Sequence, residues 1–307
     1  MKSPLRIGTR DSELAMWQAQ RVQDQLQKIG IDAILCPVKS TGDLILDQPL
    51  YELGITGIFT KTLDVALINK EIDIAVHSMK DVPTQLPKGV VQTAVLERAS
   101  TTDILVHKGA DFLKEKGTIA TGSLRRKAQW LYQYPNHQVV DLRGNVNTRL
   151  IKLIENDWHG AIFAKAGLER IKLLPKDAIE LDWMIPAPAQ GAMVIVALET
   201  NVAAVTATQR LNHKESEICT LVEREFLKTL EGGCTAPIGA LATIKDKILH
   251  FKGCLHALDG STKVEVVKER PVDKFQGFGK SCAYEILESG GEALMKMIKD
   301  ELNNPIH

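Results

Sequence analysis

The sequence predicts an α/β protein with two lobes built on mostly parallel sheets, followed by a small C-terminal α+β domain. Two stretches in which strand-like and helical patterns alternate predict the lobes, because this alternation is typical of parallel sheets. From about His213 the pattern changes to one long helix, three strand-like segments and two helices. A chain of 307 residues has room for two or three domains of about 100 to 150 residues each.

The first alternating stretch runs from residue 5 to the motif at residues 73–83. Strand-like sequence at 5–9 leads through a polar turn into a helix whose apolar side chains recur every three or four residues. A strand at 31–38, a loop at 39–57 and a helix at about 59–67 then lead to a strand that begins at Asp73. The loop is long for a compact domain, so we expect it to be mobile or functional.

The second alternating stretch begins near residue 101 and predicts strands at 103–106, 118–121, 139–142 and 160–164. Prolines break up the segment that follows, and the apolar run at 192–198 could return the chain to the first sheet. We therefore expect a discontinuous first domain of residues 1–97 and 191–212 and a second domain of residues 98–190. Two such lobes, joined by two crossings, are like those of periplasmic binding proteins and would enclose a cleft.

Residues 213–307 are expected to form the third domain. A helix through Phe226 ends near the glycine pair at 232–233, and glycine commonly follows the end of a helix. Strands are predicted at 238–244, 248–255 and 262–267, with a hairpin turn at 258–261. A segment of this size can fold alone.

The composition favours a soluble enzyme or binding protein over a nucleic-acid or membrane protein. Lys and Arg number 38, equal to Asp and Glu, so no overall field attracts nucleic acid or an anionic membrane. No apolar run approaches the roughly 20 residues of a membrane span, and no signal-peptide core follows Met1. We expect a cytoplasmic protein without a membrane or nucleic-acid partner.

Cysteine and histidine usage predicts neither disulfides nor a metal site. The five cysteines are odd in number and contain no CxxC pair. The nearest His and Cys cluster, His250, Cys254 and His256, lies on strand-like sequence and is interpreted as packing and surface.

The motif at residues 73–83 carries the strongest candidate for chemistry. Strand-like sequence runs into a polar turn with Lys80 and Asp81, and Pro83 stops the strand. Ligands of open parallel sheets bind at such strand ends. An ordinary loop with solvated charges explains this motif alone equally well.

Arginines recur in or beside the predicted strand-to-helix turns. They are Arg10, Arg125, Arg126, Arg143, Arg149 and Arg170. Thr121 to Arg126 also place the N–H groups of a helix start beside two guanidiniums, which suits a carboxylate or a phosphate. Surface ion pairs explain any one arginine, but six at equivalent turns indicate a polyanionic ligand. Nucleic acid is disfavoured by the neutral totals and the scarcity of nearby aromatic residues.

Cys234 follows a predicted helix end, where the negative end of the helix dipole raises the pKa of a thiol. A protease-like thiolate is therefore disfavoured. A buried free thiol and a covalent attachment point on a flexible loop both remain possible. No Gly-rich nucleotide loop and no GxSxG elbow is present.

Together these motifs resemble the porphobilinogen deaminase family. The resemblance rests on six stretches in family order: 7–12, 77–83, 122–126, 142–149, 166–170 and 230–234. The chain departs from the family pattern at the end of the long loop (53–57), at Gly122, where serine is frequent, and at Ala189, where glycine is usual.

The resemblance implies a transferase of porphyrin and heme biosynthesis. It would deaminate four porphobilinogen molecules and join them head to tail into the linear tetrapyrrole hydroxymethylbilane, on a dipyrromethane cofactor held by a thioether to Cys234. It implies Asp81 as the catalytic carboxylate. The implied cofactor-binding residues are Ser78, Lys80, Asp81, Thr121, Ser123, Arg125, Arg126, Arg143, Gly144 and Cys234, and the implied substrate-binding residues are Arg10, Ser12, Arg149, Arg170 and Gln190.

The residues make physical sense of this implication. Each pyrrole ring brings two carboxylates, so an arginine-rich cleft suits the growing chain. A thioether acts only as an anchor, so Cys234 need not be activated. We expect a monomer. The rival hypothesis is a two-lobed solute-binding or sensor protein that captures a dicarboxylate without chemistry.

Overall fold

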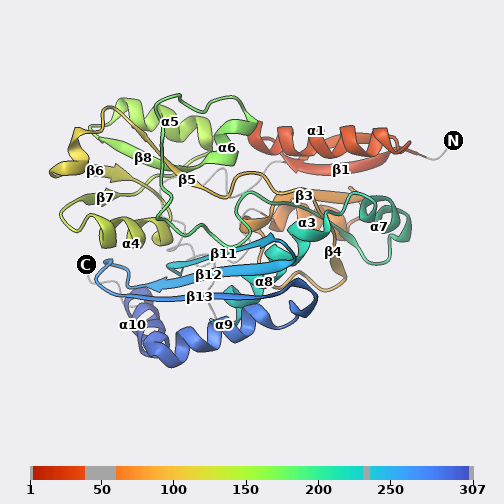
Figure 1. The fold of residues 1–307 in the computed structure, drawn as a ribbon. Coiled ribbons are helices and arrows are strands. Elements are labelled where there is room, and N and C mark those ends of the chain that lie inside the picture. The colour runs from red at the N-terminus through yellow and green to blue at the C-terminus, as the bar shows by residue number, and fades with distance from the viewer. Residues whose placement is uncertain (1–2, 39–59, 231–235, 304–307) are drawn as a thin grey trace.

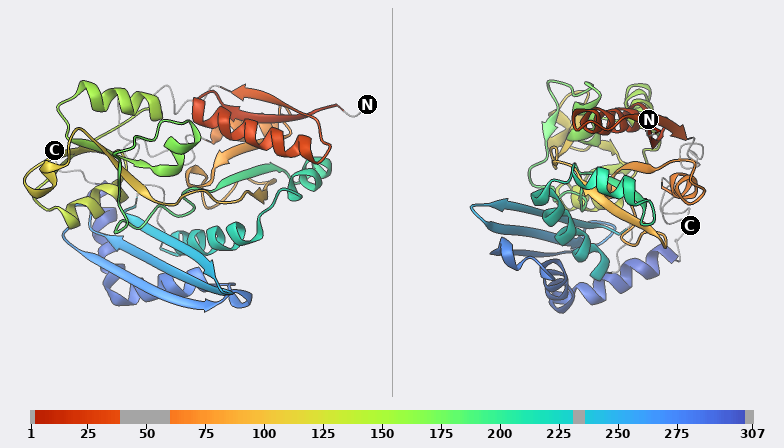
Figure 2. Two further views of the ribbon diagram at one scale, coloured as in Figure 1. Left: turned by 45° about the horizontal axis from the view of Figure 1, so that its top comes forward. Right: turned by 90° about the vertical axis from the view of Figure 1, so that its right-hand side faces the viewer.

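Two five-stranded sheets and one three-stranded sheet organise the molecule (Figure 1). A computed structural model describes residues 3–38, 60–230 and 236–303 of the chain. The first sheet lies beside the second, and the three-stranded sheet lies below both in this view. The turned views in Figure 2 show the same three groups of elements.

The first sheet has the strand order β2-β1-β3-β10-β4. Its strands are β1 (Leu5–Arg10), β2 (Ala33–Val38), β3 (Ile74–Ser78), β4 (Val90–Val95) and β10 (Met193–Leu198). β1 pairs in parallel with β2 and β3, whereas β10 is antiparallel to β3 and β4. Four of the five strands therefore run in the same direction.

Helices cover both faces of this sheet, which explains why its central strands are apolar on both sides. The apolar stripe of α1 (Glu13–Lys28) buries Ala19, Val22 and Leu26 against one face. α3 (Lys61–Ile68) buries Leu63 and Leu67 in the core on the other face. α7 (Val202–Gln209) follows β10 and contacts β4 and β10.

The second sheet repeats this plan with the order β7-β6-β8-β5-β9. Its elements are β5 (Asp103–His107), β6 (Thr118–Ala120), α4 (Leu124–Gln133), β7 (Gln138–Val140), α5 (Val146–Glu155), β8 (Gly160–Ala164), α6 (Lys165–Arg170) and β9 (Ile179–Glu180). β6 is parallel to β7 and β8, and β5 is antiparallel to β8 and β9. Two cores result, one with Trp130 of α4 and one with Leu153 of α5 and Leu168 of α6.

Two crossings connect the sheets, as the sequence predicts. One joins β4 to β5, and the other joins β9 to β10. Their backbones are hydrogen-bonded to each other, from Ala99 N–H to the Gly191 carbonyl over 3.2 Å. The strands that enter a sheet directly from the other sheet, β5 and β10, are the antiparallel ones, because no crossover helix turns the chain around before them.

The C-terminal elements form an antiparallel sheet covered by helices. They are α8 (Lys214–Thr229), β11 (Ile238–Lys245), β12 (Ile248–His256), β13 (Lys263–Pro271), α9 (Phe278–Ile286) and α10 (Glu292–Asn303). Phe226 of α8, Phe251 of β12 and Phe278 of α9 meet in one core. Gly290 adopts a positive φ of 99° between α9 and α10 and so permits the bend between these helices.

The predicted fold class is confirmed, with the refinement that each large sheet contains one antiparallel strand. β4, β9 and α7 were not predicted from the pattern. The loop expected at residues 39–57 lies outside the described residues. The division into domains at residues 97, 190 and 212 stays a prediction.

Candidate active site

The strand β3 ends in a polar turn that carries Lys80 and Asp81. Residues 74–77 are buried because β1 and β10 flank β3. A 3-10 turn at Met79–Asp81 follows, and Pro83 has no N–H with which to continue the strand. The Met79 N–H donates to the Ala192 carbonyl over 3.0 Å. The turn is thus fixed on one side to the start of β10.

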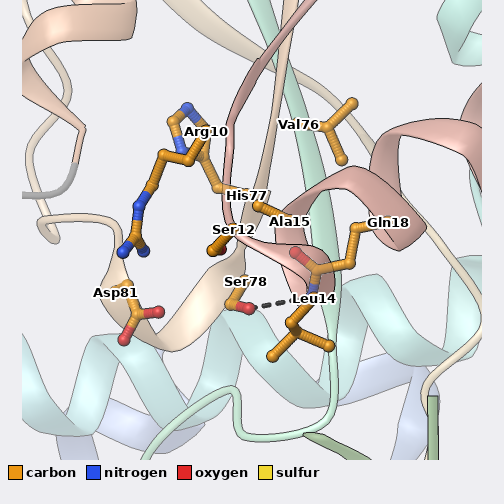
Figure 3. Close-up of a pocket in the computed structure, with 9 residues that line it drawn as sticks. All are labelled: Arg10, Ser12, Leu14, Ala15, Gln18, Val76, His77, Ser78 and Asp81. Atoms are coloured by element: carbon orange, nitrogen blue, oxygen red, sulfur yellow. Dashed lines mark hydrogen bonds between the residues drawn. The ribbon is translucent and has the colours of Figure 1, made fainter. Parts of the chain in front are cut away.

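A pocket lies beside this turn, between the end of β1, the start of α1 and the end of β3 (Figure 3). It is lined by Arg10, Ser12, Leu14, Ala15, Gln18, Val76, His77, Ser78 and Asp81. The Arg10 guanidinium and the Asp81 carboxylate lie on the same side of it. Ser12 is the N-cap residue of α1, but its side chain makes no capping hydrogen bond. The structure therefore brings together Arg10, Ser12, Ser78 and Asp81 from two separate motifs.

His77 lines the same pocket, although it was not among the predicted site residues. Its ring is buried, and Nε2 has no hydrogen-bond partner within the described part of the chain. Burial, and then the positive charge of Arg10, lower the pKa of His77 to about 4. The ring is neutral at neutral pH and adds no positive charge to the pocket.

Lys80 points from the turn toward the second lobe. Its Nζ donates to Gln190 Oε1 over 3.4 Å. Burial, and then the charge of Arg126, lower the pKa of Lys80 to about 8, while Asp81 and Asp103 oppose this shift. An ammonium held with so low a pKa is stabilised when an anionic ligand arrives.

Gln190 connects the two lobes at this point. Its side chain is fully buried, and Nε2 donates to the Thr101 carbonyl over 2.7 Å and to Asp103 Oδ1 over 2.9 Å. With Lys80 on its oxygen, the amide is fixed in orientation. The predicted site residue Gln190 therefore joins the turn of the first sheet to the start of β5.

Two buried arginines mark the start of α4 in the second lobe. Ser123 caps this helix, its side chain accepting from the Arg126 N–H, and the Ser123 N–H donates to Thr121 Oγ1 over 3.3 Å. Arg125 and Arg126 pair with the buried Asp103 carboxylate over 2.8 and 2.7 Å. Burial alone would raise the pKa of Asp103, but these guanidiniums hold it well below its usual range. Their partner is thus a buried carboxylate, not the surface acid that the simpler interpretation assumed.

Two further predicted arginines lie around the start of α5. Arg143 is buried, and burial lowers its pKa. Gly144 has a φ of +115°, and a Cβ there would lie 2.7 Å from the Thr148 side chain, so the turn requires glycine. Burial, and then Arg126, lower the pKa of Arg149 to about 10, with Asp81 opposing. The Arg149 Nε is buried and has no acceptor among the described residues.

Arg170 is the last residue of α6, one short helix beyond the strand-to-helix turn at the end of β8. Its Nη2 donates to the Gly191 carbonyl over 2.7 Å, and its guanidinium lies 5.6 Å from the centre of the Trp17 ring. Because α6 has only six residues, Arg170 at its end still lies near the end of β8.

Cys234 lies outside the described residues. The description of the chain stops at Leu230, just after α8, and resumes at Ala236, just before β11. The other four cysteines are free thiols, and Cys219, Cys254 and Cys282 are buried.

Three residues near the site were missed by the sequence analysis. Arg98, in the first crossing, pairs with Glu223 of α8 through two hydrogen bonds of 2.7 and 2.9 Å. Glu223 also accepts from the backbone N–H groups of Ala189 and Ala242. Arg224 donates to carbonyls of the turn that carries Asp81. The signal available in the sequence for two of them was that Glu223 and Arg224 are charged residues beside the apolar stripe of the helix.

The arrangement concentrates positive charge from both lobes around few carboxylates. The pKa of Arg149 is influenced by Arg126, Asp81, Arg143 and Arg10, which come from four different elements or turns. These groups therefore share one electrostatic environment. Such a cluster can bind a ligand with several carboxylates, and Asp81 can face a positive charge that develops on it.

Within residues 3–38, 60–230 and 236–303, no three His, Cys, Asp or Glu side chains come together as a metal site. In the same ranges, no helix has the length and apolar character needed to span a membrane.

Comparisons with known proteins agree in family. The family model described as porphobilinogen deaminase, dipyromethane cofactor binding domain, matches residues 5–206, and the model of the C-terminal domain matches residues 217–288. A porphobilinogen deaminase of Chloroherpeton thalassium is 41% identical over 272 residues, which cover 86% of this chain and 87% of the relative. The chloroplastic porphobilinogen deaminase of Oryza sativa is 39% identical over 305 residues, which cover 94% and 85%.

Among solved structures, the chain is similar to a periplasmic binding protein with high arginine specificity from Salmonella typhimurium. The TM-score is 0.40 at 16% identity, over 70% of this chain and 93% of that one.

Proposed function

The chain belongs to the porphobilinogen deaminase family, and we propose that the cationic cluster around Asp81 is the place where it performs the reaction of that family. The enzyme is a transferase of tetrapyrrole biosynthesis. It deaminates porphobilinogen and joins the rings head to tail into hydroxymethylbilane on a dipyrromethane cofactor. The resemblance inferred from six sequence motifs is thereby confirmed.

The residues of the cluster fit a ligand such as dipyrromethane. Its acetate and propionate groups are carboxylates, and Arg149 offers a buried N–H that has no acceptor among the described residues. We assign cofactor binding to Ser78, Lys80, Asp81, Thr121, Ser123, Arg125, Arg126, Arg143, Gly144 and Cys234. When bound, the cofactor supplies the pyrrole end to which the first substrate ring is joined.

Substrate carboxylates are assigned to a second group, Arg10, Ser12, Arg149, Arg170 and Gln190. Arg10 and Ser12 line the pocket beside Asp81, which supports their assignment. Arg170 is bound to the Gly191 carbonyl. Its assignment therefore requires that it share this contact with a ligand or exchange it for one.

Asp81 is assigned the role of the catalytic carboxylate. Loss of ammonia from porphobilinogen leaves an electron-poor ring whose positive charge is shared with the pyrrole N–H. A fixed carboxylate that accepts from this N–H stabilises the charge, and it can take up the proton that the next carbon–carbon bond releases. The surrounding cations bind the carboxylates of the ring and so hold them away from Asp81.

The observation that carries this proposal is the meeting of Asp81 with Arg10, Ser12 and Ser78 in one pocket. Its test is the intact mass of the purified protein. The mass should exceed that of the sequence by one dipyrromethane, because a thioether survives denaturation. Cys234→Ser should remove the added mass and the activity, whereas Cys36→Ser, at a partly exposed cysteine of the first lobe, should change neither.

An unmodified protein that makes hydroxymethylbilane would contradict the proposed role of Cys234. An unmodified, inactive protein that binds a dicarboxylate would instead favour the two-lobed solute-binding function.

A cytoplasmic location and a monomeric state stay predictions. The first rests on the neutral overall charge, and the second on the sequence pattern, in which no exposed apolar stripe argues for more than a monomer. Light scattering of the purified enzyme checks the second.

A further inference from the structure

The side chain of Arg224 extends from α8 to the turn that carries Asp81. Its Nη1 donates to the Val82 carbonyl over 2.8 Å and to the Met79 carbonyl over 3.3 Å. Its Nη2 donates to the Pro83 carbonyl over 2.6 Å. One guanidinium from the C-terminal elements therefore holds three carbonyls of the first lobe, on both sides of Asp81 in the sequence.

The turn depends on contacts from outside because it is short. It contains three residues of 3-10 helix, closed by a hydrogen bond of 3.2 Å from the Val82 N–H to the Met79 carbonyl. Such turns have poorer hydrogen-bond geometry than an α-helix. The β10 side holds the Met79 N–H, and Arg224 holds the carbonyls that follow. The planar fork of a guanidinium suits this task, since it fixes direction as well as distance.

The helix that supplies Arg224 is itself fixed. The preceding residue, Glu223, is fully buried and binds Arg98 and the Ala189 N–H in the two crossings. The chain then runs from the end of α8 into the segment that contains Cys234. α8 is therefore connected to the Asp81 turn by Arg224 and to the Cys234 segment by the chain itself.

We propose that Arg224 is a positioning residue for the reaction: it holds the turn so that the Asp81 carboxylate keeps its orientation toward the bound rings. This inference rests on the proposed function of Asp81. The hydrogen bonds from Arg224 to this turn end on backbone carbonyls, so Arg224 acts through the position of Asp81 and not on the substrate. The alternative is that Arg224 merely joins the C-terminal elements to the first lobe and contributes only stability.

The experiment compares Arg224→Gln and Arg224→Lys with Arg6→Gln. Arg6 binds Asp73 over 3.0 Å at the other end of the β3 segment, and so serves as a matched control for the loss of an arginine contact in the same lobe. For each protein, kcat, KM, thermal midpoint and intact mass are measured. Hydrogen exchange of the amides of residues 80–82 is followed by mass spectrometry on the same samples.

We expect Arg224→Gln to lower kcat about 10- to 100-fold with KM changed less than about 3-fold, because small misplacements of catalytic groups cost this much. Exchange at residues 80–82 should become faster. Arg224→Lys keeps the charge but loses the fork, so it should fall between wild type and Arg224→Gln. Arg6→Gln should lower the thermal midpoint without either effect.

A wild-type kcat in Arg224→Gln would overturn the inference, and so would unchanged exchange at residues 80–82. Equal losses of kcat in Arg224→Gln and Arg6→Gln, or failure of Arg224→Lys to fold, would assign Arg224 to stability alone. The exchange measurement applies whether or not the variant carries the cofactor. Asp81→Asn distinguishes a failure of the proposed function from a failure of the positioning role. Near-normal turnover in Asp81→Asn would contradict the proposed function. Loss of turnover in Asp81→Asn together with normal turnover in Arg224→Gln would contradict only the positioning role of Arg224.

Discussion

Asp81 and Asp103 are two carboxylates of one cationic cluster with different surroundings. Asp103 is fully buried and binds Arg125, Arg126 and Gln190. Asp81 lines a pocket and is partly exposed. A carboxylate that is enclosed by protein cations organises the site, while one that faces a pocket can respond to a ligand. The contrast between them supports Asp81 as the reactive group.

Replacement of Asp81 tests this contrast at the level of one residue. Asp81→Asn should lower kcat by about 10²- to 10³-fold or more, because the amide lacks the charge that stabilises the cationic ring. The midpoint of urea unfolding should change little, since the side chain lies in a pocket. Asp111→Asn, at an exposed carboxylate in another 3-10 segment, is the control. Turnover close to wild type in Asp81→Asn would move the reactive role to another group.

At the scale of elements, the start of α4 depends on β5. The two helix arginines are held by Asp103, the first residue of β5, and Arg126 also donates to the Ile162 carbonyl of β8. Their guanidiniums are buried, so they cannot be satisfied by water if the carboxylate is lost. The pair is therefore both part of the candidate site and part of the second lobe's structure.

Asp103→Asn should therefore lower the free energy of unfolding by about 3 to 5 kcal/mol, as expected when one partner of a buried ion pair is removed. Urea denaturation measures this change. Glu180→Gln breaks the pair of Lys165 and Glu180, whose side chains are 23% and 47% exposed, and should cost about 1 kcal/mol or less. Equal losses of unfolding free energy in the two variants would show that burial does not increase the penalty for removing one partner of the Asp103 pair.

The second crossing contains a local backbone feature at Ala189, one of the positions where the sequence departs from the pattern that it resembles. Ala189, where the family pattern has glycine, adopts a φ of 62°. A residue with a Cβ is strained in this left-handed region by about 1 to 2 kcal/mol. Its N–H donates to Glu223 over 2.6 Å, so the conformation is held by a buried charge. Gly122 shows the reverse case: a Cβ there would lie 2.5 Å from the Leu142 carbonyl, so this backbone accepts glycine and not serine.

At the scale of the whole molecule, α8 connects the first sheet, the two crossings and the three-stranded sheet. Glu223 binds Arg98 and Ala189 in the crossings and Ala242 in β11, while Arg224 binds the turn after β3. The second lobe is joined to the C-terminal elements by the Ala240 N–H, which donates to the Pro186 carbonyl over 2.9 Å. Any relative motion of the lobes during chain growth must therefore keep or exchange these contacts.

Two buried histidines in different parts of the molecule predict acid sensitivity of the whole fold. Burial is the main cause that lowers the pKa of His77 and of His256 from 6.5 to about 4. Between these values the unfolded chain binds a proton at each site and the folded chain does not. Stability is therefore fully present above pH 6.5 and falls as the pH drops toward 4, by on the order of 3 kcal/mol per histidine.

Urea midpoints between pH 4.5 and 7.5 measure this dependence. His77→Gln and His256→Gln should each reduce the slope of the unfolding free energy against pH by the equivalent of up to one bound proton, and the double variant by up to two. His250→Gln, at a ring with 45% exposure, should leave it unchanged. A double variant with the wild-type slope would contradict the assignment.

The sequence by itself determined the class of the fold and the family. Strands 103–106 and 160–164 were predicted within one residue of β5 and β8, because short apolar runs between polar turns leave little choice of structure. Ser123 and Asn145 cap the starts of α4 and α5 with their side chains, and both are residue types that favour the start of a helix. Six short motifs in order sufficed for the family, since each reflects local chemistry.

Only the tertiary structure decided which charges meet. Asp103 reads in the sequence as the polar first residue of a strand, and it became a site residue because α4 places two arginines against it. Arg98 reads in the sequence as a charge of a connecting segment, and Glu223 and Arg224 read as charges on a helix. They meet their partners only because the crossings and the Asp81 turn pack against α8. Hydrogen bonds between residues more than a hundred positions apart depend on the packing of whole elements, which no local pattern encodes.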